Sequence, residues 1–449
     1  MKQTLVLIAA AIIGFSTPVL AQSDDNETEI TVTNAEGKKE IIDLPEAMTS
    51  EYDSLLSVYN SRTYLKINTD CNMPDVNPVY SKEVYKERLA RIPSVIELPY
   101  NDVVQKFIDR YSGRLRRSVS IMLGAQNFYM PTFEEALESY GLPLELKYLP
   151  VIESALNPNA VSRVGATGLW QFMLSTGKQY GLEVNSLVDE RRDPVRASYA
   201  AAHYLRDLYK IFGDWNLVIA AYNCGPDNIN KAIHRSNGAT DYWQIYPYLP
   251  KETRGYVPAF IAANDIMNYY CDHNICPMQA NLPGKTDTVV VSRDVHFEQV
   301  AQVLGMEIDQ IKQLNPQYRR NIVNGSTRPM ALRLPATLVG KFIDNEDSIY
   351  AYRPDVLLAK RTEVEVNDDV PSYSRRSSSS SRSKSTSSRK SRSKGKKGKK
   401  NKGGRNVTIR QGDTLSDIAK RNGTTVSKLK KLNKISGSSI RAGKKLRIK

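Results

Sequence analysis

The sequence predicts a mainly α-helical domain, followed by small βααβ modules that are joined by a basic linker. Three observations support this fold class. Apolar residues keep a helical spacing almost without interruption from about Tyr100 to Ile275. A strand-helix-helix-strand pattern then occurs twice, over residues 285–336 and over residues 405–449. Between the two patterns, residues 340–404 become rich in Ser, Arg, Lys and Gly, which lack the apolar surface that folding needs.

The first 21 residues have the features of a secretory signal peptide. A Lys precedes an apolar run from Leu5 to Phe15, and small residues at Val19-Leu20-Ala21 suit cleavage. The run is short for a membrane span, and no Cys follows it to carry a lipid anchor. No other segment is apolar enough to cross a bilayer. We therefore expect an exported protein without a transmembrane span, whose mature chain starts at Gln22.

The next segment, residues 22–99, is polar and mixed, and its weak periodicity indicates no function. Residues 143–158 give a clearer signal, because Leu144, Tyr148, Val151 and Ile152 share one face of a helix. We expect this helix to begin at Pro143, to be kinked by Pro150 and to stop at Asn157-Pro158.

Glu153 then lies in the last turn of this helix, half-buried among apolar neighbours and at the negative end of the helix dipole. Both effects should raise its pKa above the roughly 4.3 of a free Glu. A Glu that stays protonated near neutral pH can donate its proton to a glycosidic oxygen. The small-residue loop and aromatic-amide cluster of Gly165–Phe172 should return to this carboxylate. This pattern indicates a wall-cleaving enzyme, although a lone Glu at a helix end is more often a solvated charge.

Further helices have recognisable ends. Asp193-Pro194 should open a long helix, and Gly225-Pro226 should close the apolar helix that contains Leu217–Tyr222. One face of the long helix carries Ala202, Leu205, Leu208, Tyr209 and Phe212.

The two βααβ patterns can be followed element by element. The first has strands at Thr286–Val291 and Ala331–Leu334, which enclose helices at Phe297–Leu304 and Ile308–Leu314. The second has strands at Val407–Ile409 and Lys445–Ile448. Its two helices turn inward the residues Leu415, Ile418, Ala419, Val426, Leu429 and Leu432.

Four cysteines would meet an oxidising compartment after export. They are Cys71, Cys224, Cys271 and Cys276. One or two disulfides are expected, and four cysteines allow three full pairings that the sequence does not separate. Cys271 and Cys276 flank His273, but no second pair stands at zinc-finger spacing, so we expect neither a metal nor another cofactor.

The formal net charge of +15 comes from the C-terminal part of the chain. Residues 375–405 hold 14 Lys or Arg and no acid, and residues 406–449 hold 12 against two Asp. Nucleic acid is not an expected partner, because no aromatic residue lies between Ser374 and Arg405 to stack on bases and the chain carries an export signal. We expect this linker to lie along an anionic envelope surface, with binding that weakens in salt.

Four motifs stand in the order seen in the family 1 lytic transglycosylases, which the chain therefore resembles. They are Glu153-Ser154, Gly168-Leu169-Trp170-Gln171, Ala221-Tyr222-Asn223-Cys224-Gly225 and Gly255-Tyr256-Val257-Pro258. The resemblance is strongest to the membrane-bound lytic murein transglycosylase D group, in which peptidoglycan-binding LysM modules follow the catalytic domain. It covers about residues 100–275 and the C-terminal module. It implies a lysozyme-like, goose-type catalytic domain and glycan strands of peptidoglycan as the partner.

The resemblance also assigns roles. Glu153 would be the single general acid and base that cleaves the bond between N-acetylmuramic acid and N-acetylglucosamine and leaves a 1,6-anhydro end. Ser154 would support Glu153 within the substrate site, Gln171 would hydrogen-bond the substrate, and Tyr222, Asn223 and Tyr256 would line the cleft. Each has a plainer alternative, since Tyr222 and Trp170 could be core aromatics and Asn223 a helix-end residue.

Two departures from the family pattern stand out. Trp170 replaces the Met of many relatives, which would reshape a sugar subsite. Residues 285–336 have Arg293-Asp294-Val295-His296 in place of the LysM turn, so this module is a degenerate LysM whose glycan binding is in doubt. In the C-terminal module, Gly412, Asp413 and Thr414 would form one side of a glycan groove, or would only cap a helix.

Two other functions remain open. A lysozyme of the same fold would need a second carboxylate, for which Asp189, Glu190 and Asp193 are candidates. A non-catalytic wall-binding scaffold is the other, which the intact Glu153-Ser154 argues against. The expected organisation is a signal peptide (1–21), an N-terminal segment (22–99), a catalytic domain (100–278), a degenerate LysM-like module (285–336), a flexible linker (340–404) and a LysM domain (405–449). The expected location is the periplasm of a Gram-negative bacterium, at the cell wall.

Overall fold

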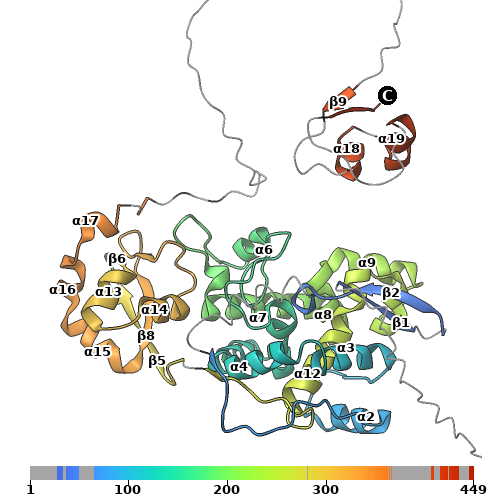
Figure 1. Cartoon of the computed structure of the whole chain (residues 1–449), viewed down its shortest axis with the longest axis horizontal. Coiled ribbons are helices and arrows are strands. Elements are labelled where there is room, and N and C mark those ends of the chain that lie inside the picture. The colour runs from blue at the N-terminus through green and yellow to red at the C-terminus, as the bar shows by residue number, and fades with distance from the viewer. Residues whose placement is uncertain are drawn as a thin grey trace, which may run out of the picture. The chain divides into compact units, whose positions relative to one another are not determined.

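The structure is a computed structural model (Figure 1) that describes residues 28–33, 37–49, 65–280, 282–359, 361–362, 364, 366, 406–408, 415–422, 424–433 and 444–448. The chain divides into two compact units, residues 1–373 and residues 374–449. The predicted signal peptide lies outside the described residues. Within the described ranges, no helix has both the length and the apolar character that a membrane crossing requires.

Helices dominate the first unit, which confirms the predicted mainly α domain (Figure 1). Its α-helices up to residue 268 are α2 (Lys82–Arg91), α3 (Asp102–Ser112), α4 (Arg116–Ser139), α5 (Leu149–Ser154), α6 (Leu174–Gln179), α7 (Pro194–Phe212), α8 (Trp215–Cys224), α9 (Pro226–Arg235), α10 (Tyr242–Ile245), α11 (Lys251–Arg254) and α12 (Tyr256–Asn268). Short 3-10 helices are η1 (Glu46–Met48), η2 (Leu144–Tyr148), η3 (Glu190–Arg192) and η4 (Tyr246–Tyr248). Helix α12 is buried from Tyr256 to Met267 and packs on α3, α5 and α8, so it forms the centre of the core.

Local capping explains the helix ends that the sequence predicts. The Asp193 carboxylate accepts hydrogen bonds from the Val195 and Arg196 amides at 2.9 and 3.0 Å and begins α7. Gly225, at φ 82°, ends α8, as expected. Tyr209 of α7 is 38% exposed, and its ring stacks on Trp215 with ring centroids 4.1 Å apart.

The helix predicted over residues 143–158 is two elements, η2 and α5, which meet at Tyr148. The predicted kink at Pro150 is therefore wrong. Pro150 lies in the first turn of α5, where its missing N–H has no helical partner to lose. Helix α5 also ends earlier than predicted, at Ser154, because Ala155 and Leu156 adopt left-handed conformations with φ 47° and 59°. Glu153 remains in the last turn.

The N-terminal segment contains structure that its weak periodicity does not predict. Strand β1 (Glu29–Thr33) pairs antiparallel with β2 (Lys39–Asp43), with Ile30 opposite Ile42. Ile30, Val32, Ile42 and Met48 are buried in the same core as the helices. Further along, β3 (Leu65–Lys66) pairs with β4 (Gln279–Ala280).

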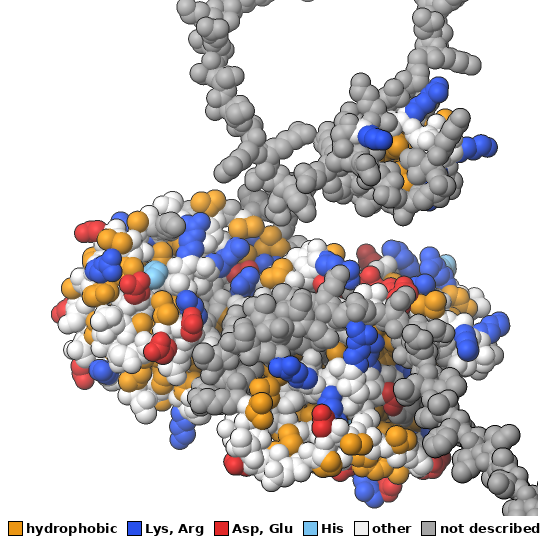
Figure 2. Space-filling view, viewed as in Figure 1, with side chains coloured by type: hydrophobic (Ala, Val, Ile, Leu, Met, Phe, Trp, Pro, Cys, Tyr) orange, Lys and Arg blue, Asp and Glu red, His pale blue; other side chains and the backbone are white. Residues whose placement is uncertain are grey.

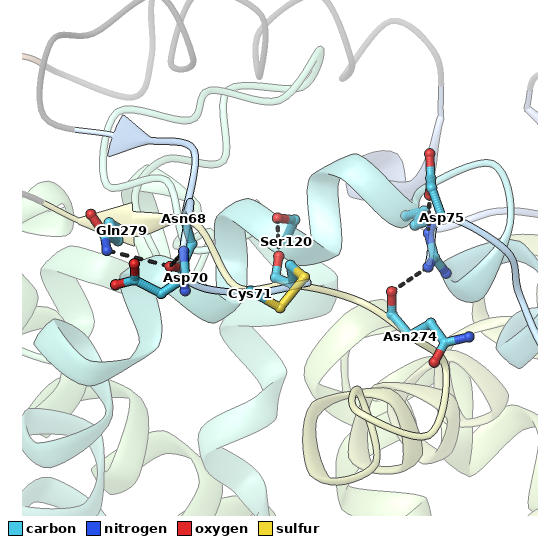
Figure 3. Close-up of a disulfide and its surroundings, with 9 residues drawn as sticks. Asn68, Asp70, Cys71, Asp75, Ser120, Asn274 and Gln279 are labelled. Carbon is cyan, nitrogen blue, oxygen red and sulfur yellow. Dashed lines mark hydrogen bonds and ion pairs between the residues drawn. A yellow bond between two sulfur atoms is a disulfide. The ribbon is translucent and has the colours of Figure 1, made fainter. Parts of the chain in front are cut away.

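A disulfide joins Cys71 to Cys276 and leaves Cys224 and Cys271 as free thiols. Figure 3 shows it beside Ser120 of α4, whose hydroxyl donates a hydrogen bond to the Cys276 carbonyl. The bond ties the segment after β3 to the segment before β4, so the N-terminal segment is linked to the end of the helical domain.

The first βααβ pattern is confirmed at each predicted element. The elements are β5 (Thr286–Val291), α13 (Phe297–Leu304), α14 (Ile308–Leu314) and β8 (Met330–Pro335), to which the structure adds a short pair, β6 (Asp294–His296) with β7 (Ile322–Asn324). The flexible linker predicted from residue 340 is wrong over its first part. Three helices continue there, α15 (Ala336–Asp344), α16 (Glu346–Ala351) and α17 (Pro354–Leu357), and Phe342, Ile349 and Tyr350 are buried against the module.

The second unit, residues 374–449, has the predicted βααβ order. Strand β9 (Asn406–Thr408) pairs with β10 (Lys445–Arg447), and α18 (Leu415–Arg421) and α19 (Val426–Asn433) lie between them in the chain. Its core is formed by Leu415, Ile418, Ala419, Leu429, Leu446 and Ile448. Gly412, Asp413 and Thr414 lie outside the described residues.

Candidate active site

A cleft of about 770 Å³ opens beside the end of α5 in the first unit. Its described lining brings together five of the predicted residues, Glu153, Gln171, Tyr222, Asn223 and Tyr256. They come from α5, the following loop, α8 and the start of α12, which are far apart in the chain. Ser154 does not line the cleft, and its side chain is fully buried.

Glu153 has the environment that a general acid needs. The Tyr256 hydroxyl donates a hydrogen bond to Glu153 Oε1 at 2.5 Å. Burial raises the pKa of Glu153 to about 7; the Tyr256 hydrogen bond opposes this shift, and the negative charge of Glu46 adds to it. The predicted upward shift is confirmed, so a substantial fraction of Glu153 is protonated near neutral pH.

Ser154 holds the end of α5 in place. Its hydroxyl lies 3.0 Å from the Pro150 carbonyl oxygen and 2.9 Å from the Leu169 carbonyl oxygen. The second contact crosses from the helix to the loop that carries Gln171. Ser154 therefore ties the helix that carries Glu153 to this loop, and its buried side chain does not face the cleft.

The loop from Gly165 to Phe172 packs tightly on the chain around η3. Gly168 has φ 90°, and a Cβ there would lie 1.8 Å from the Arg191 carbonyl oxygen, so only glycine fits. The Arg191 guanidinium forms a bidentate pair with Asp189, with both N–O distances 2.9 Å. It also donates to the Gly165 and Phe172 carbonyls, each at 3.2 Å. Asp189 thus orients Arg191, and Arg191 in turn holds the loop from Gly165 to Phe172 in place.

None of the three acids proposed as a second carboxylate lines the cleft. Asp189 pairs with Arg191, and Asp193 caps α7. Glu190 is buried and accepts a hydrogen bond from Arg328 of the LysM-like module at 2.9 Å. The acids other than Glu153 that do line it are Glu29, Asp43, Glu46 and Glu252.

The polar residues of the cleft are held by hydrogen bonds to the backbone and to each other. Gln171 has φ 48° and donates through Nε2 to the Gly168 carbonyl at 2.7 Å. The Tyr222 hydroxyl donates to the Trp170 carbonyl at 2.7 Å, and Asn223 Oδ1 accepts from the Thr253 hydroxyl at 3.0 Å. These contacts pre-organise the side chains before a substrate arrives.

Trp170 is a core residue. It is fully buried, its Nε1 donates to the Ser198 hydroxyl at 2.9 Å, and it is absent from the cleft lining. Trp170 thus matches the plainer alternative of a core aromatic, and its side chain does not line the cleft.

The N-terminal segment lines part of the cleft, which the sequence analysis did not predict. Seven residues between Thr28 and Thr49 line the cleft, namely Thr28, Glu29, Asp43, Leu44, Pro45, Glu46 and Thr49. The alternation of Ile30 and Val32 with Thr residues is the signal that could have indicated a half-buried strand here.

No three His, Cys, Asp or Glu side chains in the described part of the chain come together to hold a metal ion. His273, between Cys271 and Cys276, is fully buried, and its Nε2 lies 3.3 Å from Asp265 Oδ2. On the face seen in Figure 2, acidic and basic side chains of the first unit are interspersed.

Comparisons with known proteins agree with this site. The transglycosylase SLT domain family matches residues 130–245, the lytic transglycosylase MltD LysM-like domain matches residues 285–351, and the LysM domain matches residues 407–449. The chain is 29% identical over 355 residues to the membrane-bound lytic murein transglycosylase D of Escherichia coli (strain K12), which covers 78% of this chain and 70% of that protein. It is 33% identical over 139 residues to the soluble lytic murein transglycosylase of the same strain, which covers 30% of this chain and 22% of that protein.

Among solved structures, the 70 kDa soluble lytic transglycosylase SLT70 of Escherichia coli matches with a TM-score of 0.28 and 30% identity, over 32% of this chain and 24% of that chain. The combination of the SLT, LysM-like and LysM matches defines the class of protein. This chain has the domain order of a lytic transglycosylase, because its SLT domain match is followed by a LysM-like match and a LysM match. The expected lysozyme-like catalytic domain agrees with the SLT match.

Proposed function

We propose that this chain cleaves the β-1,4 bond between N-acetylmuramic acid and N-acetylglucosamine in peptidoglycan and that Glu153 is its single general acid and base. The observation that carries this proposal is the placement of Glu153 in the cleft. Burial raises its pKa to about 7, so the side chain can both give and take a proton near neutral pH. Glu153-Ser154 is also the motif on which the family resemblance rests.

The reaction has two proton transfers at one carboxyl group. In the first, Glu153 gives its proton to the glycosidic oxygen, the C1–O bond breaks with both electrons on that oxygen, and positive charge develops at C1 of the muramyl sugar. In the second, the Glu153 carboxylate takes the proton of the muramyl 6-hydroxyl, whose oxygen forms the new bond to C1. The product ends in a 1,6-anhydro sugar, and Glu153 is protonated again. Because the attacking hydroxyl belongs to the same sugar, no water has to be positioned.

Tyr256 is suited to the ionised stage of this cycle. Burial and the neighbouring Glu153 charge raise the pKa of Tyr256 well above its ordinary value, so it stays a hydrogen-bond donor. A donor 2.5 Å from Oε1 stabilises the carboxylate that remains after the first proton transfer. Tyr222, Gln171 and Asn223 would contact the sugar rings and their acetamido groups, which is the proposed substrate-binding set.

The nearest alternative is a lysozyme that uses water instead of the 6-hydroxyl. Such an enzyme needs a second carboxylate to activate the water. Asp189, Glu190 and Asp193 are held away from the cleft by their own partners, which weighs against these three acids as the group that activates the water. A non-catalytic scaffold is disfavoured by the raised pKa of Glu153.

The LysM modules would bring the enzyme to its substrate. We assign glycan binding to residues 405–449, with Gly412, Asp413 and Thr414 as the candidate groove, and a supporting contact with an anionic envelope surface to the basic linker. An exported, cell-wall-associated enzyme in a Gram-negative periplasm fits these assignments. Pelleting of the chain with sacculi should then weaken as the salt concentration rises.

Digestion of purified sacculi tests the proposal. The wild-type chain should release products that end in 1,6-anhydro-muramic acid, and Glu153→Gln should release none while still pelleting with sacculi. Products one water heavier would identify a lysozyme. Continued cleavage by Glu153→Gln would refute the role of Glu153.

A further inference from the structure

Residues 28–49 are built into the active site although they precede the SLT match at residues 130–245. The Arg110 guanidinium of α3 donates to the Met48 carbonyl oxygen through Nε and one terminal nitrogen, at 3.1 and 2.9 Å. Arg254 of α11 pairs with Glu40 of β2 at 3.0 Å. With Met48 fully buried, this segment is a fixed part of the domain and not a loose N-terminal extension.

The same segment touches the catalytic motif backbone to backbone. A Cβ on Gly255 would lie 2.7 Å from the Asp43 carbonyl oxygen. Gly255 directly precedes Tyr256, which donates to Glu153. The glycine of this motif is therefore needed where β2 crosses it, and the position of β2 is coupled to that of Tyr256.

Glu46 is the acid that this arrangement brings to Glu153. It is the first residue of η1, and η1 packs on α5, the helix that carries Glu153. Its Oε1 accepts a hydrogen bond from the Arg163 backbone amide at 3.0 Å, and the Arg163 Nε lies 3.8 Å away. The Glu46 side chain is 35% exposed and lines the same cleft as Glu153.

We propose that Glu46 is a second functional carboxylate of this cleft, which acts through its negative charge on the glycosyl cation that forms as the bond breaks. The inference rests on the proposed function, because it needs a positive charge to develop at C1. A fixed negative charge in a partly water-excluded cleft favours that charge more than it would in bulk water. Asp189, Glu190 and Asp193 do not line the cleft and cannot take this place.

The same charge acts on the general acid. Of the acids that line the described cleft, Glu46 is the one whose charge adds to the upward pKa shift of Glu153. Removal of the charge should therefore lower the pKa of Glu153 and move the basic limb of the pH–rate profile to lower pH. The other titratable or charged groups that face the cleft are Glu29, Asp43, Glu252, Arg163, Tyr204, Tyr222, Tyr256 and Cys224, and the test leaves them unchanged.

Substitutions of Glu46 can separate the effect of its negative charge from the effect of its hydrogen bond to Arg163. Glu46→Gln keeps the size and an oxygen that can accept from the Arg163 amide, but it removes the charge. Glu46→Ser is a second neutral variant, and Glu46→Asp keeps the charge. Glu138→Gln is a matched control, because Glu138 is an exposed acid of α4 that does not line the cleft.

Initial rates on soluble peptidoglycan chains should be measured from pH 4 to pH 9, together with the Tm of each variant. We expect both neutral variants to lose roughly tenfold in kcat, about 1.4 kcal/mol in activation free energy, with little change in KM. Their basic limbs should move to lower pH, while Glu46→Asp and Glu138→Gln keep the wild-type limb.

Wild-type rate and pH profile in Glu46→Gln would overturn the inference, since Glu46 would then only anchor the loop at Arg163. A rise in KM alone would overturn it too, because the residue would then act in binding only. If Glu46→Gln does not fold, the comparison of Glu46→Ser with Glu46→Asp decides in the same way. Absence of 1,6-anhydro products from the wild-type chain would instead refute the proposed function.

Discussion

Glu153, at the end of α5, should lower the free energy of unfolding at alkaline pH, where its buried side chain is charged. Burial raises the pKa of Glu153 from 4.5 to about 7. Because one pKa unit corresponds to about 1.36 kcal/mol, this rise corresponds to about 3 kcal/mol. The cleft admits water, which makes this value an upper limit.

The direction follows from the raised pKa. The folded state holds the proton of Glu153 more tightly than the unfolded chain does. Below about pH 4.5 the carboxyl group is protonated in both states, so its burial carries no penalty for a buried charge. Stability then falls as the pH rises toward about 7, where the folded carboxyl ionises, and the loss is complete above that pH. Glu153→Gln removes the titration and keeps an oxygen that can accept from Tyr256.

We therefore expect Glu153→Gln to unfold at a higher temperature than the wild-type chain at pH 8, by up to roughly 5 °C, and at about the same temperature at pH 4. Differential scanning calorimetry at pH 4, 6 and 8 measures this, with Glu138→Gln as a control for the loss of an exposed acid. An equal gain at all three pH values, or no gain at pH 8, would refute the claim that burial of the charged carboxylate is the cause.

Three further predictions concern the supports of the site. Ser154→Ala removes the donor to the Pro150 and Leu169 carbonyls, so it should lower the free energy of unfolding by about 1–2 kcal/mol and slow sacculus digestion; unchanged denaturant midpoint and rate would contradict this. Arg328→Ala removes the partner that the LysM-like module supplies to the buried Glu190, so it should lower the free energy of unfolding by about 2 kcal/mol. The change is measured as a lower Tm, and an unchanged Tm would show that this contact does not stabilise the fold. Cys71→Ser removes a disulfide with a sequence separation of 205 and should lower the free energy of unfolding in denaturant by about 3–5 kcal/mol. Reduction of the wild-type chain is the matching control and should give an equal loss. An unchanged free energy of unfolding in Cys71→Ser would refute the prediction.

Elements with local signals were predicted well. Asp193 and Gly225 mark their helix ends because a cap forms within a few residues, so the neighbouring sequence contains the whole interaction. The strand Thr286–Val291 and the helix Phe297–Leu304 agree with the structure for the same reason, since alternation and helical spacing are local patterns.

Elements that depend on partners were missed. The β1–β2 hairpin has strands of only five residues, and it is stable because Ile30, Val32 and Ile42 pack on helices that come much later in the chain. The linker predicted from residue 340 overlaps the second half of α15 and all of α16. Phe342, Ile349 and Tyr350 are too few to form a helical pattern in the sequence, and they become a core only when the LysM-like module buries them. The pair of Cys71 with Cys276 likewise belongs to one of three full pairings that the sequence does not separate.

By itself the sequence determined the acid and its motifs. Glu153 lies in the last turn of a helix, and the residues Gln171, Tyr222, Asn223 and Tyr256 follow it in the order of the family, because local spacing and residue type are read directly from the chain. Only the tertiary structure decided what these residues do to one another. Tyr256 reaches Glu153 across 103 residues, Ser154 turns inward, and Glu46 enters the cleft from a segment to which the sequence assigned no role. The physical reason is that burial and Coulomb interactions, which tune the pKa of Glu153, depend on distances in space that separation along the chain does not determine.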